Sequence, residues 1–255
     1  MKKLLLLLLL LPSLAFAEVG KMNGVAITDA STILGVAGLG KAVGVTVAAS
    51  AGECDGYLVC QNFETATTGY DNSETWVETA DGTVEAAYTT TALRGSQSLY
   101  INDSAGTNET YNQFGTTNPV YAFFRYRPTS TANNAQIMAF NTTGAALSGY
   151  LRLDSDNYLN CFHGTVSAEG PSTLDDATTY FIWVQYQANT GAGDGILHVT
   201  VGTSATKSEG TVHCNITTGD DTDQAGRIKL HNNNADAGIY DQCLVDNAVI
   251  GDVPN

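Results

Sequence analysis

Short segments in which apolar and polar residues alternate constrain the fold of this chain most strongly. About a dozen of them follow one another, separated by turn formers such as Asp81-Gly82 and Asp194-Gly195. No long segment has the 3.6-residue period of a helix, so the pattern predicts one all-β sandwich of about 200 residues. The expected strands are residues 57–63, 75–78, 83–88, 97–102, 120–127, 135–141, 150–153, 158–163, 180–187, 195–202, 210–215, 227–232 and 238–250.

The last of these segments, residues 238–250, carries a carboxylate among apolar residues. As a regular strand it would point Asp241 to the same side as Ile239 and Val245. A buried charge is tolerated when it is paired or bound to a metal, and the candidate helper is Glu64, near the start of the sandwich. We therefore expect the first and last strands to meet there and to close the sandwich.

The N-terminal part differs from everything that follows it. Residues 1–17 contain Lys2 and Lys3, eight consecutive leucines and Ala15-Phe16-Ala17, which is the pattern of a cleaved signal peptide. Residues 18–52 are rich in Gly, Ala and Val and contain no aromatic residue, so they cannot bury a core alone. They are either a flexible tether or a strand-like arm that pairs with a neighbouring subunit. The sandwich then occupies residues 53–255, and no later segment could span a membrane.

The charge of the chain excludes two classes of partner. The sequence has 11 Lys and Arg against 26 Asp and Glu, and removal of Lys2 and Lys3 leaves 9 basic residues and a net charge of −17. Nucleic acids and anionic lipids are bound through clustered Lys and Arg, so neither is an expected partner. A high negative charge keeps a protein soluble, which is one explanation for this composition. Calcium binding by some of the carboxylates is the alternative.

The five cysteines include no C-x-x-C pair and fit an oxidising, exported setting better than a metal site. Cys54 and Cys60 are predicted to close a short disulfide loop. Cys161 is expected to pair with Cys243 or with Cys214, and the spacing does not choose between them. One of these three cysteines is then left over, as a thiol or in a bond to another chain.

Six motifs follow one another along the chain: Phe63-Glu64, Leu93-Arg94-Gly95-Ser96-Gln97-Ser98-Leu99, and residues 120–127, 150–156, 180–186 and 240–246. In this order they resemble the concanavalin A-like (LamG-type) jelly rolls over about residues 57–251. The resemblance implies two antiparallel sheets, one convex and one concave, with carbohydrate recognised on the concave face or at the loop rim. It also implies a structural calcium between a glutamate near the first strand and an aspartate in the last, which are Glu64 and Asp241 here.

Catalytic motifs found on this type of fold are missing from the sequence. Retaining glycoside hydrolases with this fold carry Glu-x-Asp-x-x-Glu on one strand, and no such string occurs. The Gln-x-His pair of alginate-lyase relatives is replaced by Gln136-Ile137-Met138, which lacks the histidine that could abstract a proton. We therefore expect a non-catalytic protein, with a polysaccharide-degrading hydrolase or lyase as the alternative.

Two strands offer a stripe that could bind a sugar. Tyr121, Phe123, Arg125 and Arg127 share one side of their strand, and Phe181, Trp183, Gln185 and Gln187 share one side of theirs. Aromatic rings would stack on sugar rings, while Arg and Gln would bond the hydroxyls. The predicted glycan contacts are Tyr121, Arg125, Arg127, Trp183, Gln185 and Gln187, provided that the two strands are neighbours. Both sides of the second strand are equally apolar, so Phe123, Phe181 and Trp183 could equally belong to the core.

Taken together, these patterns predict an exported protein, secreted or at the surface of a cell, with a leader of bacterial appearance. It is expected to be a two-sheet antiparallel jelly roll with an extended N-terminal arm. The expected function is binding of a polysaccharide or other glycan, or self-assembly into an oligomer or filament through residues 18–52. Calcium is the only expected cofactor, in a structural role.

Overall fold

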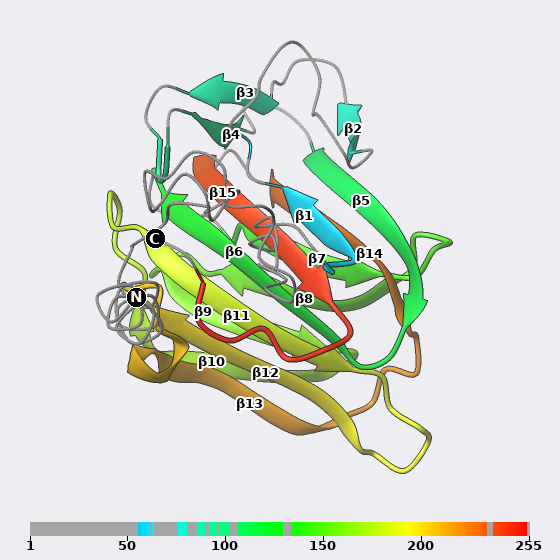
Figure 1. The fold of residues 1–255 in the computed structure, drawn as a ribbon. Helices are drawn as coiled ribbons and strands as arrows, with labels where there is room; N and C mark the ends of the chain where they lie inside the picture. The colour runs from blue at the N-terminus through cyan, green and yellow to red at the C-terminus, as the bar shows by residue number, and fades with distance from the viewer. Residues whose placement is uncertain are drawn as a thin grey trace, which may run out of the picture. The chain divides into compact units, whose positions relative to one another are not determined.

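The computed structural model describes residues 56–61, 63, 76–80, 86–89, 92–95, 97–102, 107–129, 134–233 and 237–253. These residues form two antiparallel sheets, which confirms the predicted two-sheet jelly-roll sandwich (Figure 1). Sheet A contains, in spatial order, β13 (Thr211–Gly219), β12 (Gly195–Gly202), β11 (Tyr180–Gln187), β6 (Val120–Pro128), β15 (Ala237–Asp246), β4 (Ser98–Asn102) and β3 (Ala86–Thr89), and β1 (Val59–Gln61) also pairs with β15. Sheet B contains β10 (Val166–Thr173), β9 (Tyr158–His163), β8 (Leu147–Leu153), β7 (Gln136–Asn141), β14 (Ala225–Asn233), β5 (Thr107–Thr117) and β2 (Trp76–Ala80).

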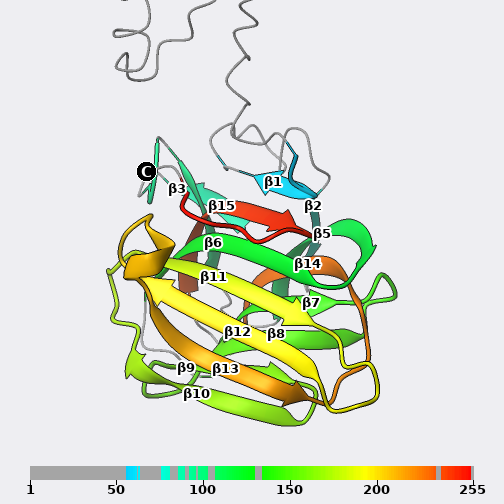
Figure 2. The same ribbon diagram turned by 60° about the horizontal axis from the view of Figure 1, so that its bottom comes forward.

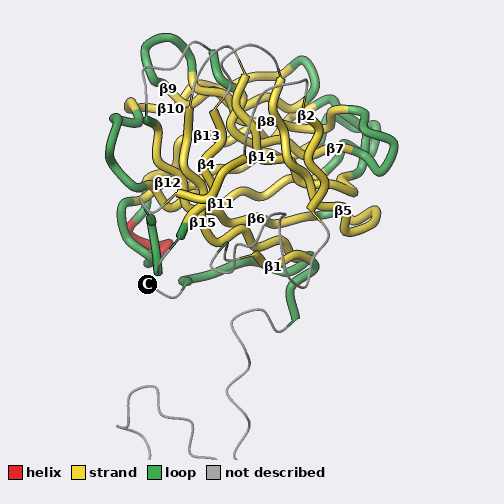
Figure 3. The backbone as a smooth tube through the Cα atoms, turned by 90° about the horizontal axis from the view of Figure 1, so that it is seen from above, coloured by secondary structure: helices red, strands yellow, loops and turns green. Residues whose placement is uncertain are grey.

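Helix is nearly absent from the described residues, as the sequence predicts. Figure 3 shows mostly strands, with loops at their ends and one short 3-10 helix, η1 (Lys207–Glu209), near the last described residues. In the described part of the chain, no helix is long and apolar enough to cross a membrane.

The main hydrophobic core fills the space between the two sheets, which lie as layers in Figure 2. Alternate residues of each strand enter it, because successive side chains in a strand point to opposite faces. Phe124 and Tyr126 of β6 enter the core from sheet A, and Leu151 of β8 and Ile228 of β14 enter it from sheet B. The sheets are also joined by a hydrogen bond, since the Tyr240 hydroxyl donates to the carbonyl oxygen of Ile137 at 3.0 Å.

The first and last strands meet, as predicted. Val59, Cys60 and Gln61 of β1 pair with Val245, Leu244 and Cys243 of β15. One end of β15 pairs with β4 and the other with β1, while its opposite edge pairs with β6 along its length. The last strand is therefore interior to sheet A, and the described chain closes where its two ends pair.

The predicted orientation of Asp241 is wrong because β15 is not regular. Its register against β6 shifts between Asp241 and Leu244, and Gln242 in this bulge has a φ of 46°. An extra residue in a strand reverses the side on which the following residues point. Ile239 and Asp241 consequently lie on the face of sheet A away from sheet B, whereas Cys243 and Val245 enter the main core. Asp241 is fully buried, but on the outer side of the sheet.

Two strands are absent from the predicted set. The inward residues Thr110 and Asn112 of β5 are polar, so this strand shows no apolar alternation. β10 contains Gly170 and Pro171, which usually mark a break in a strand. It forms nonetheless because it is an edge strand, where a proline needs no partner for its missing N–H.

The predicted pairing of Cys161 with Cys243 is wrong, and the alternative pairing with Cys214 is the one observed. Cys161 lies on β9 near one edge of sheet B, and Cys214 lies on β13 at the facing edge of sheet A. Cys243 lies on β15, which three strands separate from β13, and is a buried thiol. Cys60 is disulfide-bonded, while Cys54, its predicted partner, lies outside the described residues.

The Cys161–Cys214 bond should be a main contributor to stability, since it joins the sheets across 53 residues of sequence. Replacing both cysteines with alanine should lower the free energy of unfolding by about 2–4 kcal/mol, because the unfolded chain gains conformational freedom. Urea denaturation with and without reductant measures this, and reductant should destabilise the parent protein more than the variant. Equal stability of parent and variant would contradict the prediction.

Candidate functional site

The two strands of the predicted sugar-binding stripe are neighbours in sheet A. The register between β6 and β11 pairs Arg125 with Phe181, Phe123 with Trp183, and Tyr121 with Gln185. The intervening residues of both strands enter the main core. The predicted stripe therefore lies on one face, the outer face of sheet A.

Much of this outer face is covered by the chain itself. Residues 247–253 follow β15 and cross in front of β6 and β11 in Figure 1, so that Ile250 and Val253 form a second small core. Its other buried members are Cys60, Phe123, Phe181, Trp183, Ala205 and Leu244. The Trp183 indole donates a hydrogen bond from Nε1 to the carbonyl oxygen of Gly251 at 2.9 Å. Only 2% of Trp183 is exposed, so its ring is not available to stack on a sugar.

The covering segment is fixed by contacts with the loop between β12 and β13. The backbone N–H of Val253 donates to the Ala205 carbonyl at 3.1 Å. The Lys207 ammonium donates to the Ile250 carbonyl at 3.0 Å, and the Lys207 backbone N–H donates to Asp252 at 2.8 Å. Burial of the ammonium lowers the pKa of Lys207. Lys207 thus holds the covering segment in place.

Arg125 is also buried in the outer layer of sheet A. It is 3% exposed, its Nε donates to Gln242 Oε1 at 2.9 Å, and its Cζ lies 4.7 Å from the centre of the Phe181 ring. A guanidinium held between an amide and a ring stabilises the bulge of β15 rather than contacting a ligand. Arg127, on the same strand, is partly exposed.

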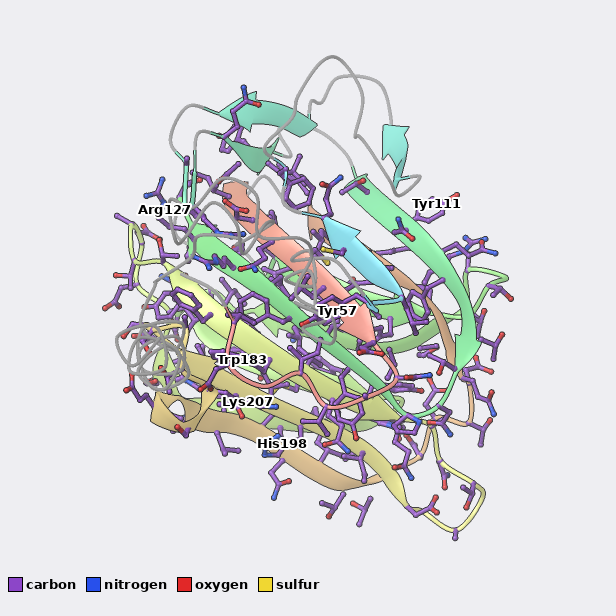
Figure 4. All side chains as sticks on the ribbon, viewed as in Figure 1. Tyr57, Tyr111, Arg127, Trp183, His198 and Lys207 are labelled. Carbon is purple, nitrogen blue, oxygen red and sulfur yellow. A yellow bond between two sulfur atoms is a disulfide. The ribbon has the colours of Figure 1, made fainter. Side chains whose placement is uncertain are left out.

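The rest of the predicted stripe lies in a polar row beside the covered area. The register places Tyr121 of β6, Gln185 of β11, His198 of β12 and Asn215 of β13 side by side. All four are at least partly exposed, as is Gln187 on the same face. Burial, with a smaller effect of the nearby Lys207 charge, lowers the pKa of His198, so the imidazole is neutral near pH 7. Figure 4 shows His198 and Lys207 over β12 and β13, with Trp183 nearby.

Of the predicted calcium ligands, only Asp241 lies among the described residues, since Glu64 falls outside them. Asp241 Oδ2 accepts a hydrogen bond from the Ser98 hydroxyl at 2.8 Å, and Arg125 is its neighbour across the β15–β6 ladder. The part of the chain that the structure describes contains no group of three or more His, Cys, Asp or Glu able to hold a metal. Calcium takes six to eight oxygen ligands, so a site at Asp241 would need ligands beyond those described.

Sheet B carries a different set of side chains on its outer face. Leu151 and Leu153 of β8 enter the core, so Tyr150 and Arg152 point outward. The same argument places Phe162 of β9 outward. It also places Arg227 and Lys229 of β14, and Tyr111 of β5, on the outer face, because the residues beside them are buried. We call this set, Tyr111, Tyr150, Phe162, Arg152, Arg227 and Lys229, the aromatic-basic face.

The register of sheet B aligns the aromatic-basic face in one row. Tyr111 pairs with Lys229, Lys229 with Ala139, Ala139 with Tyr150, and Tyr150 with Phe162. Strands lie about 4.8 Å apart, so the four steps from Tyr111 to Phe162 cover roughly 19 Å. Figure 4 shows Tyr111 at the β5 side of the molecule, well apart from the covered part of sheet A. The row is thus long enough for an extended ligand.

The side chains of this row support one another. The rings of Tyr150 and Phe162 are stacked, with centroids 4.4 Å apart and an interplanar angle of 7°. The Arg152 guanidinium carbon lies 4.7 Å from the centre of the Phe162 ring, and that of Arg227 lies 4.8 Å from the centre of the Tyr111 ring. Arg227 also donates from Nε to Gln113 at 3.1 Å. These contacts hold the planar groups in place while all six side chains remain partly exposed.

The sequence contained part of the signal for this face. The alternation in residues 150–153 and 158–163 already separates Tyr150, Arg152 and Phe162 from the leucines beside them. Tyr111 could not be found in this way, because β5 lacks apolar alternation. The pairing of β5 with β14, over 100 residues later, is what brings Tyr111 and Arg227 together.

Comparisons with known proteins support the fold. No protein-family model matches the sequence, and no curated protein matches it. Among solved structures, Cip1, a cellulose-induced protein, is 15% identical, with a TM-score of 0.55 over 76% of this chain and 99% of its own. A Bacillus subtilis protein described as galectin-like in fold is 12% identical, with a TM-score of 0.49 over 76% of this chain and 96% of its own. The VIP36 lumenal domain in its Ca²⁺/Man2-bound form is 10% identical, with a TM-score of 0.46 over 76% and 88%.

A sialidase also matches, with a TM-score of 0.47 and 10% identity over 60% of this chain, but the chain spans only 16% of the sialidase's length. The likeness to Cip1 supports the architecture, and at 15% identity it leaves the chemistry of the two outer faces to the residues themselves.

The covering segment of sheet A can be tested through Trp183. In a Trp76→Phe background, where Trp183 is the sole tryptophan, Ile250→Ala should lower the free energy of unfolding by about 2 kcal/mol. It should also shift the tryptophan emission to longer wavelength, because water reaches the indole. Val249→Ala is the matched control, since Val249 is 67% exposed. Identical behaviour of the two variants would show that Ile250 does not cover Trp183.

Proposed function

We propose that this protein binds a glycan without cleaving it, and that the aromatic-basic face of sheet B is the binding surface. The observation that carries the proposal is the aligned row in which Tyr150 and Phe162 are stacked and partly exposed, with the Arg152 guanidinium against Phe162. An exposed apolar ring offers a flat surface to the C–H face of a sugar, and the neighbouring donors can bond its hydroxyls. Binding surfaces of this kind depend on a few polar groups placed beside aromatic ones.

The outer face of sheet A is the less favourable candidate. Its largest rings, Phe123, Phe181 and Trp183, are buried under residues 247–253. The row that contains Tyr121 and Gln185 keeps one aromatic side chain for stacking. On sheet B, three aromatic residues remain partly exposed along one row.

Export is a further part of the proposal. The Cys161–Cys214 disulfide is typical of an extracellular or lumenal protein, and the leader pattern of residues 1–17 agrees with it. Self-assembly through residues 18–52 stays a prediction, because these residues lie outside the described part of the chain.

Glycan binding is tested by affinity electrophoresis in gels that contain soluble polysaccharides. Tyr150→Ala and Phe162→Ala should each weaken retardation about 3- to 10-fold, as expected for loss of one ring contact of about 0.5–1.5 kcal/mol. Tyr121→Ala is the matched control, because Tyr121 is a partly exposed aromatic residue on the other sheet. Each variant is first checked for an unchanged melting temperature.

The proposal fails if no polysaccharide in a broad panel retards the parent protein. If Tyr121→Ala alone abolishes retardation, glycan is bound on sheet A instead. Release of reducing ends or unsaturated uronates from the same polysaccharides would contradict the non-catalytic part of the proposal and favour a hydrolase or lyase.

We also propose a structural calcium ion at Asp241, with Glu64 as the second carboxylate. Added calcium should raise the melting temperature of the parent, since a ligand that binds only the folded state stabilises it. Asp241→Asn should remove this response, whatever its effect on stability without calcium. A parent protein whose melting temperature is the same in calcium and in EDTA would rule out a stabilising metal at these residues.

A further inference from the structure

We infer that the glycan bound by the aromatic-basic face is an anionic one, a polysaccharide that carries carboxylate or sulfate groups. This inference rests on the proposed function and specifies its ligand class. The argument starts from the distribution of charge. The sequence has 26 acidic and 11 basic residues, a formal net charge of −15. A face that is predominantly basic is therefore a local exception.

Sheet B provides that exception. The outward side chains that the structure describes on its strands include three basic ones, Arg152, Arg227 and Lys229, and one acidic one, Glu169. Glu169 lies at the β10 edge, opposite Asn160, which in turn pairs with Arg152. Two strand steps, roughly 10 Å, thus separate the carboxylate from the nearest basic position. The basic side chains lie over β14 and β8. Two carboxylates border them: Glu169 on β10, and Asp154 directly after β8, which accepts hydrogen bonds from the Tyr158 N–H and the Asn160 amide.

The two arginines are presented for binding rather than used within the fold. In the described part of the chain, the contacts of Arg152 are the Phe162 ring, and those of Arg227 are the Tyr111 ring and the Gln113 amide. Neither arginine forms an ion pair there. The Nε of Arg152 is buried and has no hydrogen-bond partner, so a ligand can be bound only through the terminal Nη groups of this partly exposed side chain. A planar guanidinium binds a carboxylate or sulfate through two parallel hydrogen bonds, which a neutral hydroxyl cannot match.

Basic residues on sheet A are used differently. Arg125 is buried against Gln242 and Phe181, and the Lys207 ammonium is bonded to the Ile250 carbonyl. Arg127 is partly exposed on that sheet, on the face opposite to the aromatic-basic one. Replacing Arg127 is therefore a matched control, because it removes the same charge from the outer face of sheet A.

The long-range field of the chain opposes an anionic ligand, whereas the local field favours it. At an ionic strength of about 0.15 M, charges more than about 8 Å apart are largely screened, so the nearest side chains dominate at the surface. Added salt weakens both the attraction and the repulsion. The salt dependence alone is therefore a poor test, and single charge changes at the face are the sharper one.

The experiment compares polygalacturonate with its methyl-esterified form, in which the same backbone carries no charge. Affinity electrophoresis of the full-length protein should show stronger retardation by the charged form. Arg152→Gln and Arg227→Gln should each weaken that retardation about 10-fold, as expected for one charge-assisted contact. Glu169→Gln should strengthen it, because a repulsive carboxylate is removed. Arg127→Gln should leave it unchanged.

Dextran sulfate, with dextran as its neutral partner, is the second probe and separates sulfate from carboxylate. Retardation by either charged member of a pair, with the stated response to Arg152→Gln and Glu169→Gln, supports the inference. Equal retardation by the charged and esterified forms overturns it but leaves glycan binding standing. If none of these polymers and no neutral glycan retards the protein, both the anionic-ligand inference and the proposed glycan binding are wrong. Equal retardation by oligothymidylate overturns the assignment to a glycan, since that ligand is anionic through phosphate alone.

Discussion

Burial of both faces of β6 and β11 is the constraint on which the rest of the structure depends. One side of each strand enters the core between the sheets, and the other side carries Phe123, Phe181 and Trp183. A sandwich covers only the inner side of its sheets, so these rings would remain in water without a further layer. Residues 247–253 and the β12–β13 loop provide that layer. The aromatic content of the two central strands thus dictates that sheet A is covered from outside.

This requirement divides the surface into two unlike faces. On sheet A the chain itself occupies the area where aromatic rings are densest. On sheet B the rings are spaced along the row by Lys229 and Ala139, and each one lies beside a long polar or basic side chain. Partly exposed rings of this kind are stable in water because guanidinium groups cover part of the Phe162 and Tyr111 rings, and Tyr150 stacks on Phe162. The features that keep the aromatic-basic face soluble are the same ones that suit it to a ligand with flat apolar sides and charged edges.

The sequence was sufficient for the architecture and insufficient for the choice of face. Strands with inward apolar residues, such as β11 and β12, were predicted with their observed bounds, and the pairing of first and last strands followed from the closing segment. β5 was missed because its inward residues include Thr110 and Asn112. With polar residues on the inward side, a strand shows no alternation of apolar and polar residues. The side on which Asp241 lies was predicted wrongly because one bulge residue, Gln242, reverses the alternation after it.

The alternation of apolar and polar residues could not show which face of β11 lies in the main core. Ile182 and Val184 on one side are as apolar as Phe181 and Trp183 on the other, and both sides are buried, although by different layers. What covers the outer side is a segment without regular structure, more than 60 residues later in the sequence. Contacts of that kind follow from tertiary packing. The pattern of the strand supported a sugar-binding stripe there, but it could not show that residues 247–253 cover it.

The position of β15 has a consequence for how the protein is made. It pairs with β6 on one edge and with β4 and β1 on the other, yet it follows all three of them in the sequence. Until β15 has been made, β6 and β4 have no common partner, and the aromatic outer side of β6 and β11 has no cover. A nascent chain that lacks residues 237–253 therefore presents both an open strand edge and a cluster of exposed rings, which are features that promote aggregation. Sheet A therefore cannot close before β15 has been made, and a chain truncated before β15 should be a substrate for quality control.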